Sequence, residues 1–247
     1  MNRSFQLLAA AVTVVVTGAC QKDSSPIKTT STGETNVSSP SDSMAARGHS
    51  LVRVVNAVTN GGDVTVQLSD QPLFRDVKPG SVTDYREITN NLADFSVRAA
   101  GTADGFKIAE KERLLLDGNR YTVFLIAEDL AKSSLRVVRD DVVPDSGKAR
   151  IRVVHAALGA PELDVSIAGT TEKLFSGVNF KSEAGYKDIA PGSVTLELRA
   201  KDATKVLLRL PAMKLERVTA TTVVITGAAK PGHLMFTDAL LAQTPKP

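Results

Sequence analysis

The sequence is poor in the residues on which cross-links and many functional sites depend. It contains no tryptophan, one cysteine and three histidines in 247 residues, and aromatic residues make up 4% of it. A single cysteine, Cys20, excludes an internal disulfide. The histidines, His49, His155 and His233, lack the spacing of a zinc site. We therefore expect no metal and no cofactor, and the lack of aromatic girdles argues against an outer-membrane barrel.

Motifs for catalysis and nucleotide binding are also missing. No serine lies in a Gly-x-Ser-x-Gly elbow, and there is no Gly-x-Gly-x-x-Gly or phosphate-binding loop. Basic and aromatic residues do not interleave as they do in single-strand binders, so nucleic acid is not an expected partner. The absence of these patterns predicts a protein that is not an enzyme.

The N-terminus is the most specific feature that is present. Arg3 gives a positive start, residues 5–16 form an apolar run, and small residues lead from Thr17 to Cys20. This arrangement resembles a bacterial lipoprotein signal, although Thr17 stands where a larger aliphatic residue is usual. The resemblance implies cleavage after Ala19 and lipid on Cys20. One alternative is an ordinary secretory signal with a chance cysteine. Another is an uncleaved membrane anchor, but the apolar run is shorter than the roughly 20 residues that are needed to span a bilayer.

The segment that follows is predicted to be a tether. Residues 20–50 are rich in Ser, Thr, Pro, Gly and Asn and contain almost no large apolar residue, so they cannot offset the entropy cost of ordering. As a flexible coil the tether would reach about 30 Å. A residue other than Asp at position 21 permits outer-membrane sorting in enterobacteria-like systems, and this chain has Gln21. We expect an envelope protein held in the outer membrane by lipid on Cys20, facing the periplasm or the surface.

The remaining residues contain an internal repeat, whose two copies are offset by about one hundred residues. The matched segments, first copy before second, are 52–57 with 151–156, 63–66 with 164–167, 73–74 with 174–175, 85–88 with 186–189, 95–99 with 196–200 and 121–126 with 221–226. A turn-rich hinge at 144–148 separates the copies. We predict a signal peptide over 1–19, a tether over 20–50, and two domains over 51–145 and 146–242.

The matched segments have the composition of β-strands. They are short and rich in Val, Ile, Thr and Tyr, and in the run from Asp94 to Arg98 apolar and polar residues alternate. Pro-Gly turns follow Lys78 and Ala190. This density of strands predicts an all-β fold of two tandem antiparallel sandwiches, immunoglobulin-like, with two separate cores. Only residues 106–116 are ambiguous between helix and strand.

Both copies resemble a known family. The opening Val-Arg-Val-Val-(Asn/His)-Ala, the Ala-Pro-x-x-Asp-Val element at 160–165 and the Pro-Gly turn at 191–192 are similar to the bacterial domain of unknown function four-three-nine-seven. The first copy departs from the Ala-Pro-x-x-Asp-Val element. The resemblance implies an exported envelope protein, and no activity comes with it.

The recurring polar residues are interpreted as structural. Asp63 and Asp164 open matched strands, where an aspartate caps a turn more often than it binds a ligand. Asp140, Asp141 and Asp145 could bind calcium, but the preferred interpretation is that they belong to a solvated hinge.

Aromatic and basic residues recur as well. We expect each tyrosine ring to pack on the core and its hydroxyl to bond to the backbone. We expect the aliphatic part of each arginine to cover apolar surface, with its guanidinium either solvated or paired with a carboxylate. The recurring pairs are Tyr85 with Tyr186, Arg53 with Arg152, and Arg98 with Arg199.

The copies differ in charge. Residues 51–145 carry 12 basic and 15 acidic side chains, a net −3, whereas residues 146–247 carry 14 and 9, a net +5. One explanation is neutral sequence drift on solvated surfaces. Another is that the opposite charges attract the two copies to each other, or that the basic copy faces an acidic partner such as an anionic glycan. The sequence predicts a non-enzymatic binding or structural module that contacts envelope proteins. The alternative is an accessory protein that captures a ligand, such as a glycan, between the two copies.

Overall fold

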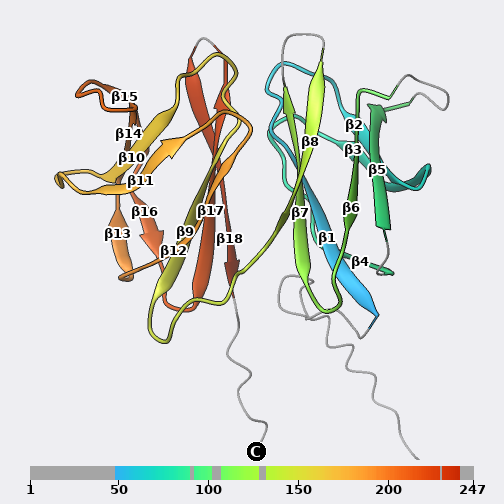
Figure 1. Cartoon of the computed structure of the whole chain (residues 1–247), viewed down its shortest axis with the longest axis horizontal. Helices are drawn as coiled ribbons and strands as arrows, with labels where there is room; N and C mark the ends of the chain where they lie inside the picture. Colours follow the sequence, from blue (N-terminus) through green and yellow to red (C-terminus); the bar gives the residue numbers. More distant parts are fainter. Residues whose placement is uncertain (1–47, 90–91, 102–106, 128–131, 229, 240–247) are drawn as a thin grey trace, which may run out of the picture. The chain divides into compact units, whose positions relative to one another are not determined.

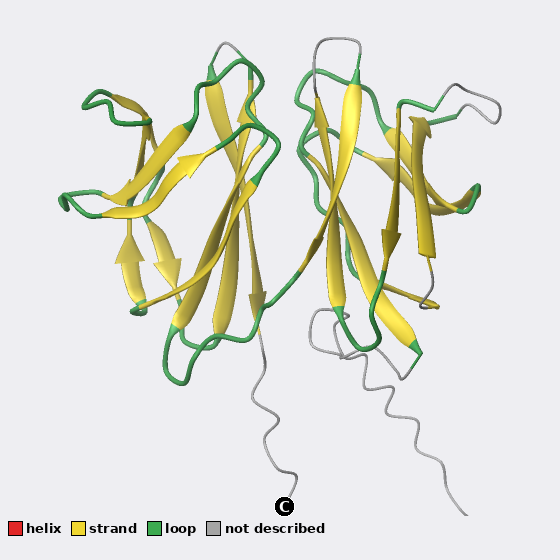
Figure 2. Ribbon diagram, viewed as in Figure 1, coloured by secondary structure: helices red, strands yellow, loops and turns green. Residues whose placement is uncertain are grey.

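The computed structural model describes residues 48–89, 92–101, 107–127, 132–228 and 230–239. Within these ranges every regular element is a β-strand (Figure 2). None of the described segments is a helix long and apolar enough to cross a membrane. The predicted cleavage site at Ala19, the lipid site at Cys20 and most of the tether lie outside the described residues.

The first half of the fold contains eight strands (Figure 1). They are β1 (His49–Asn56), β2 (Val64–Leu68), β3 (Gln71–Val77), β4 (Arg86–Thr89), β5 (Leu92–Ala99), β6 (Ala109–Leu114), β7 (Arg120–Ala127) and β8 (Ser133–Arg139). They form two four-stranded sheets, ordered β4-β1-β7-β8 and β3-β2-β5-β6. In the ambiguous segment 106–116, of which residue 106 lies outside the described residues, residues Ala109–Leu114 form strand β6.

The second half contains ten strands and follows the same plan. They are β9 (Ala149–His155), β10 (Leu163–Ile167), β11 (Lys173–Val178), β12 (Glu183–Ile189), β13 (Gly192–Val194), β14 (Leu196–Ala200), β15 (Val206–Arg209), β16 (Met213–Leu215), β17 (Thr219–Gly227) and β18 (Pro231–Ala239). The sheets run β12-β9-β17-β18 and β11-β10-β14-β15, with a two-stranded β13-β16 sheet beside them. The matched segments therefore lie in strands at corresponding places in their sheets, apart from the end residues Ala57, Asp63, Tyr85 and Ala156.

The predicted all-β sandwich fold is confirmed, with one parallel pair in each half. β1 pairs with β7 in parallel and β9 with β17 in parallel, and all other neighbouring strands are antiparallel. The Lys78 turn closes as its Pro-Gly sequence predicts, since the Ser81 amide donates to the Lys78 carbonyl at 3.2 Å and Gly80 has φ +69°.

Two apolar cores fill the space between the paired sheets. The first joins residues from Val52 to Leu135, and the second joins residues from Ala149 to Ile225. A third cluster contains side chains from both halves, and the prediction of two separate cores did not include it. Its buried members are Val55, Ala57, Phe124, Ile126, Val138, Val154, Ala156 and Val224. The outer faces of β1, β7, β9 and β17 are therefore covered rather than solvated.

The fold begins slightly earlier than the sequence indicates. β1 starts at His49, and Ser50 is fully buried, because the Ser50 hydroxyl donates to the Leu116 carbonyl at 2.8 Å. The His49 Nδ1 lies 3.3 Å from a carboxylate oxygen of Glu87.

Candidate functional site

Two buried arginines occupy equivalent positions in the two halves. Arg53 on β1 is in register with Thr122 on β7, and Arg152 on β9 is in register with Thr222 on β17. In each case the arginine Nε donates to the threonine Oγ1 at 2.9 Å. Both arginines are at most 4% exposed, so each guanidinium requires a counter-charge inside the fold.

The counter-charges are exchanged between the halves. Arg53 donates from Nη1 and Nη2 to the two carboxylate oxygens of Asp238 on β18, at 2.7 and 2.8 Å. Arg152 donates from Nη2 to Asp140, just after β8, at 2.5 Å. The aspartates are equivalent in register, because the Asp140 backbone amide donates to the Arg120 carbonyl at 2.8 Å and Asp238 pairs with Ala220. Each half therefore supplies an arginine to the other half's aspartate.

Asp140 is the most highly coordinated of these groups. Its Oδ2 accepts hydrogen bonds from the Thr122 hydroxyl at 2.6 Å and the Tyr85 hydroxyl at 2.8 Å. Burial acts to raise the pKa of Asp140, but the charges of Arg152 and Arg53 outweigh it and hold that pKa below its usual range. Asp140 is thus a buried carboxylate kept ionised, and the prediction that it lies in a solvated hinge is wrong for this residue.

Aromatic rings cover both guanidinium groups. The Arg53 guanidinium lies 4.4 Å from the ring centroids of Tyr85 and Phe236. That of Arg152 lies 4.6 Å from the Tyr186 ring and 5.5 Å from the Phe124 ring. Contacts of this kind stabilise a desolvated cation, and burial raises the pKa of both tyrosines.

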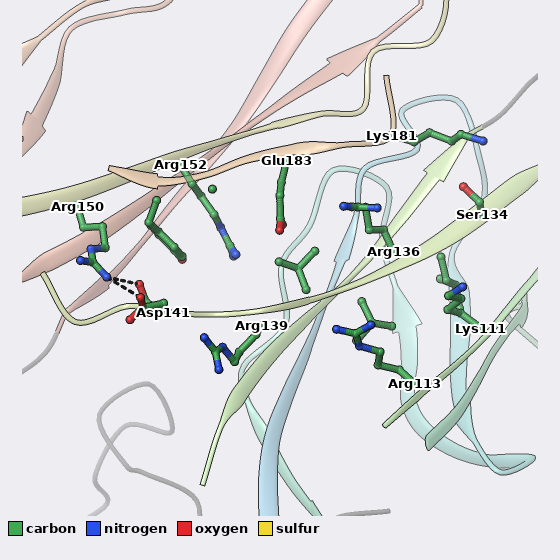
Figure 3. Close-up of a pocket in the computed structure, with 15 residues that line it drawn as sticks. Lys111, Arg113, Ser134, Arg136, Arg139, Asp141, Arg150, Arg152, Lys181 and Glu183 are labelled. Atoms are coloured by element: carbon green, nitrogen blue, oxygen red, sulfur yellow. Dashed lines mark hydrogen bonds and ion pairs between the residues drawn. The ribbon is translucent and has the colours of Figure 1, made fainter. Parts of the chain in front are cut away.

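A basic cleft of about 720 Å³ lies beside this buried cluster. Strands β6 and β8 of the first half and β9 and β12 of the second half contribute to it (Figure 3). Two of its lining residues are acidic, Asp141 and Glu183. Seven are basic: Lys111, Arg113, Arg136, Arg139, Arg150, Arg152 and Lys181. The excess of positive charge suits an anionic ligand.

Four of these cations are exposed and form no ion pair with a described residue. They are Lys111, Arg113, Arg136 and Arg139, and the charges of Arg113 and Arg136 interact with that of Glu183. Arg150 is fixed instead, because it lies 3.0 Å from Asp141 and donates to Asp188 at 2.7 Å.

Two residues that line the cleft each have a buried polar atom without a hydrogen bond. Arg152 Nη1 and Glu183 Oε2 are buried, and neither has a hydrogen-bond partner among the described residues. Burial raises the pKa of Glu183 despite the opposing charges of Arg152 and Arg136. Unsatisfied buried polar atoms are costly in a folded protein.

The expected roles of the tyrosines and arginines are confirmed in part. Both rings are packed as predicted, but neither hydroxyl bonds to the backbone of a described residue: Tyr85 donates to Asp140, and the Tyr186 hydroxyl lies 3.5 Å from the Thr222 hydroxyl. Arg53 and Arg152 are paired. The other recurring pair is also satisfied, since Arg98 donates to the Gln67 side chain at 2.7 Å and Arg199 to the Ser166 hydroxyl at 2.7 Å.

The turn-capping interpretation holds for Asp164 only in part, because its carboxylate bonds to backbone amides that lie 13 and 38 residues along the chain rather than in its own turn. Its carboxylate accepts from the amides of Gly177 and Asp202 at 2.9 Å, and Lys173 lies 2.7 Å away. Burial opposes ionisation, but the hydrogen bonds led by Lys173 keep the pKa of Asp164 well below its usual range. The Asp63 carboxylate makes no such bond with the described residues, although its carbonyl accepts from the Ala100 amide at 2.8 Å.

The histidines do not converge on a site. His155 is buried; its Nε2 lies 3.0 Å from the Pro161 carbonyl and its Nδ1 accepts from the Ala157 amide at 3.3 Å. Asn56, at the matched position, bonds in the same way to the Val77 carbonyl and the Val58 amide. Among the described residues no group of three potential ligands is placed to hold a metal ion.

Sequence reasoning missed Asp238, Glu183 and the two threonines. A signal for a covered outer face was present: in Val52–Asn56 apolar residues point to both faces of the strand, a pattern typical of strands buried on both sides. Nothing in the sequence identifies which carboxylates reach the two arginines.

Comparison with known proteins supports the family resemblance for part of the chain. Residues 50–166 match the model of a family described as a domain of unknown function, DUF4397. No curated protein matches the chain.

Several solved structures resemble the chain at low identity. A proposed cell adhesion protein from Bacteroides ovatus is 12% identical, with 80% of this chain and 99% of that chain covered and a TM-score of 0.25. Another from Bacteroides eggerthii is 7% identical, with coverage of 81% and 98% and a TM-score of 0.21. A third from Parabacteroides distasonis is 10% identical, with coverage of 78% and 97% and a TM-score of 0.23. Likeness at this level carries no conclusion about partner or activity.

Proposed function

We propose that this chain is a membrane-anchored envelope lipoprotein of bacteria that binds a partner and catalyses no reaction. Its folded part would consist of two β-sandwich domains, over 51–145 and 146–242, the second being a further copy of the first. The observation that carries the binding role is the cleft, where Lys111, Arg113, Arg136 and Arg139 are exposed and form no ion pair with a described residue.

The proposed anchor rests on the sequence before the fold. Gly18-Ala19-Cys20 ends an apolar run, and more than one acyl chain on Cys20 would give stable membrane association. We expect Cys20→Ser to move the protein from the membrane to the soluble fraction while its urea midpoint stays unchanged. Retention of the variant in membranes would contradict lipid anchoring.

A binding role is supported by the way the titratable groups are used. Asp140 accepts from Arg152, Thr122 and Tyr85 inside the fold, and His155 is held by the Pro161 carbonyl and the Ala157 amide. These groups stabilise structure and are not presented to a substrate, whereas general acid–base catalysis needs a group within reach of one.

Two kinds of partner fit this role, and one experiment separates them. An interaction module would capture envelope proteins; a ligand-binding accessory protein would capture an anionic glycan in the cleft. The basic lining of the cleft favours the second. The lipidated protein should be used as bait on intact envelopes, beside the double variant Arg113→Gln, Arg136→Gln. A partner captured equally by both chains, or no partner at all, would contradict binding through the cleft.

A further inference from the structure

We propose that the cleft binds an acidic polysaccharide, through sulfate or carboxylate groups carried on its sugar rings. This inference rests on the proposed binding function and specifies its ligand. It depends on three features of the cleft: a row of exposed cations that form no ion pair with the described residues, a fixed opposite wall, and the acidic side chain of Glu183 among the cations.

The cations line the side of the cleft that belongs to the first half. Lys111 and Arg113 lie two residues apart on β6, so their side chains leave the same face of the strand, and Arg136 lies on the adjacent β8 (Figure 3). Repeated positive charge along a groove matches a polymer with a repeated negative charge better than it matches a single small anion.

The opposite wall is rigid. Arg150 on β9 is bonded to Asp188 on β12 and lies 3.0 Å from Asp141. Arg152 is held by Asp140 and Thr222. A ligand would therefore meet a preformed surface, which reduces the entropy cost of binding.

Glu183 distinguishes a sugar from a simple polyanion. It lines the cleft among the cations, and its charge interacts with those of Arg113 and Arg136. A carboxylate repels phosphate or sulfate but accepts a hydrogen bond from a hydroxyl. A ligand with both acidic groups and hydroxyls matches a lining that combines cations with one carboxylate.

Other anionic partners fit less well. The one aromatic residue that lines the cleft, Tyr186, lies under the guanidinium groups of Arg152 and Arg150 at 4.6 and 6.0 Å. It offers no stacking platform of the kind that single-stranded nucleic acids use. A bilayer presents a plane of headgroups, whereas these cations lie in a cleft.

The test measures binding of labelled saccharides to the full lipidated chain in detergent. The probes are oligogalacturonate, a sulfated heparin fragment and methyl-esterified oligogalacturonate, which keeps the backbone and loses the charge. We expect the first two to bind, the ester not to bind, and the affinity to fall as salt is raised. Binding of oligogalacturonate alone or of heparin alone would assign the acidic group as carboxylate or as sulfate.

Variants localise the binding. The double variant Arg113→Gln, Arg136→Gln should weaken binding of the acidic saccharide about tenfold or more. The matched control is Lys205→Gln, Arg217→Gln, which removes the same charge from exposed residues outside the cleft. Equal losses in both double variants would overturn the proposal, because general electrostatic attraction would then account for the binding.

Glu183 gives a test of opposite signs. Glu183→Met should weaken binding of the saccharide, because the variant lacks the carboxylate that accepts from a sugar hydroxyl. It should strengthen binding of inorganic polyphosphate, because the variant lacks the negative charge that repels phosphate. Tighter binding of both probes, or preference of the parent protein for polyphosphate, polyglutamate or phosphatidylglycerol vesicles, would overturn the saccharide assignment. If no saccharide binds while envelope capture still depends on Arg113 and Arg136, this inference fails and the proposed function stands.

Discussion

Arg53 donates hydrogen bonds of 2.7 and 2.8 Å to the two carboxylate oxygens of Asp238, which lies 185 residues later in the chain. Arg152 makes the reciprocal contact with Asp140 at 2.5 Å. The two pairs lie beside an apolar cluster that both halves share. They act as a polar lock between two sheets whose facing surfaces are otherwise hydrophobic.

Asp238→Asn should be strongly destabilising. It keeps the shape of the side chain but leaves the Arg53 guanidinium without its bidentate carboxylate, and breaking a buried pair in this way costs about 3–5 kcal/mol. Urea unfolding measures the loss. The control is Glu216→Gln, because the Glu216–Lys214 pair has exposed fractions of 60% and 80%, and such pairs contribute below about 1 kcal/mol. A similar small loss in both variants would show that the lock does not stabilise the fold.

Tyr85→Phe and Tyr186→Phe should differ although the residues occupy matched positions. The Tyr85 hydroxyl donates to the ionised Asp140 at 2.8 Å, whereas the Tyr186 hydroxyl is 3.5 Å from the Thr222 hydroxyl. We expect Tyr85→Phe to lower the free energy of unfolding by about 1.5–3 kcal/mol, the range for a bond to a charged group. Tyr186→Phe should lower it by much less. Equal losses measured by urea unfolding would count against the hydrogen-bond assignment.

Asp164→Ala should cost more than Asp63→Ala. The first substitution leaves the amides of Gly177 and Asp202 without their acceptor. Because Gly177 is half-buried and Asp202 exposed, we expect about 1 kcal/mol for each lost hydrogen bond rather than the larger cost of a buried unsatisfied amide. The Asp63 side chain has no hydrogen bond with the described residues. Thermal unfolding of both variants measures the difference, and a larger loss for Asp63→Ala would contradict the assignment.

Glu183 should make the fold less stable as the pH rises. Burial raises its folded-state pKa above the unfolded value of about 4.3. Between those two values the native state holds more protons than the unfolded state, so stability falls with rising pH across that window. Replacing Glu183 by Gln removes this effect. We expect the stability of Glu183→Gln relative to the parent to increase from about pH 4 upward; a difference independent of pH would exclude a raised pKa.

The strands could be predicted because their signals are local. Alternation in residues 94–98 and the matched segments around Val52 and Ile151 fall in strands β5, β1 and β9. The Pro-Gly turn after Lys78 closes as its sequence demands. Patterns of this kind depend on residues a few positions apart, and the sequence contains them in full.

The polar lock could not be predicted because its signals are not local. Asp140 and Asp141 precede a proline-containing turn and have the appearance of solvated residues. Asp140 is nevertheless buried, because Tyr85 and Arg152 reach it from other strands. Which carboxylate meets which arginine depends on how the two sheets face each other, and that arrangement leaves no periodic trace in the sequence.

The exchange of charges has a consequence for how the protein can be shortened. Arg53 belongs to the first described strand and Asp238 to the last. Synthesis proceeds from the N-terminus, so the opening strand acquires its bidentate counter-ion only when the final strand has been made. A deletion confined to the last few residues of β18 would therefore damage the sheet at the other end of the polypeptide, far from the missing residues in sequence.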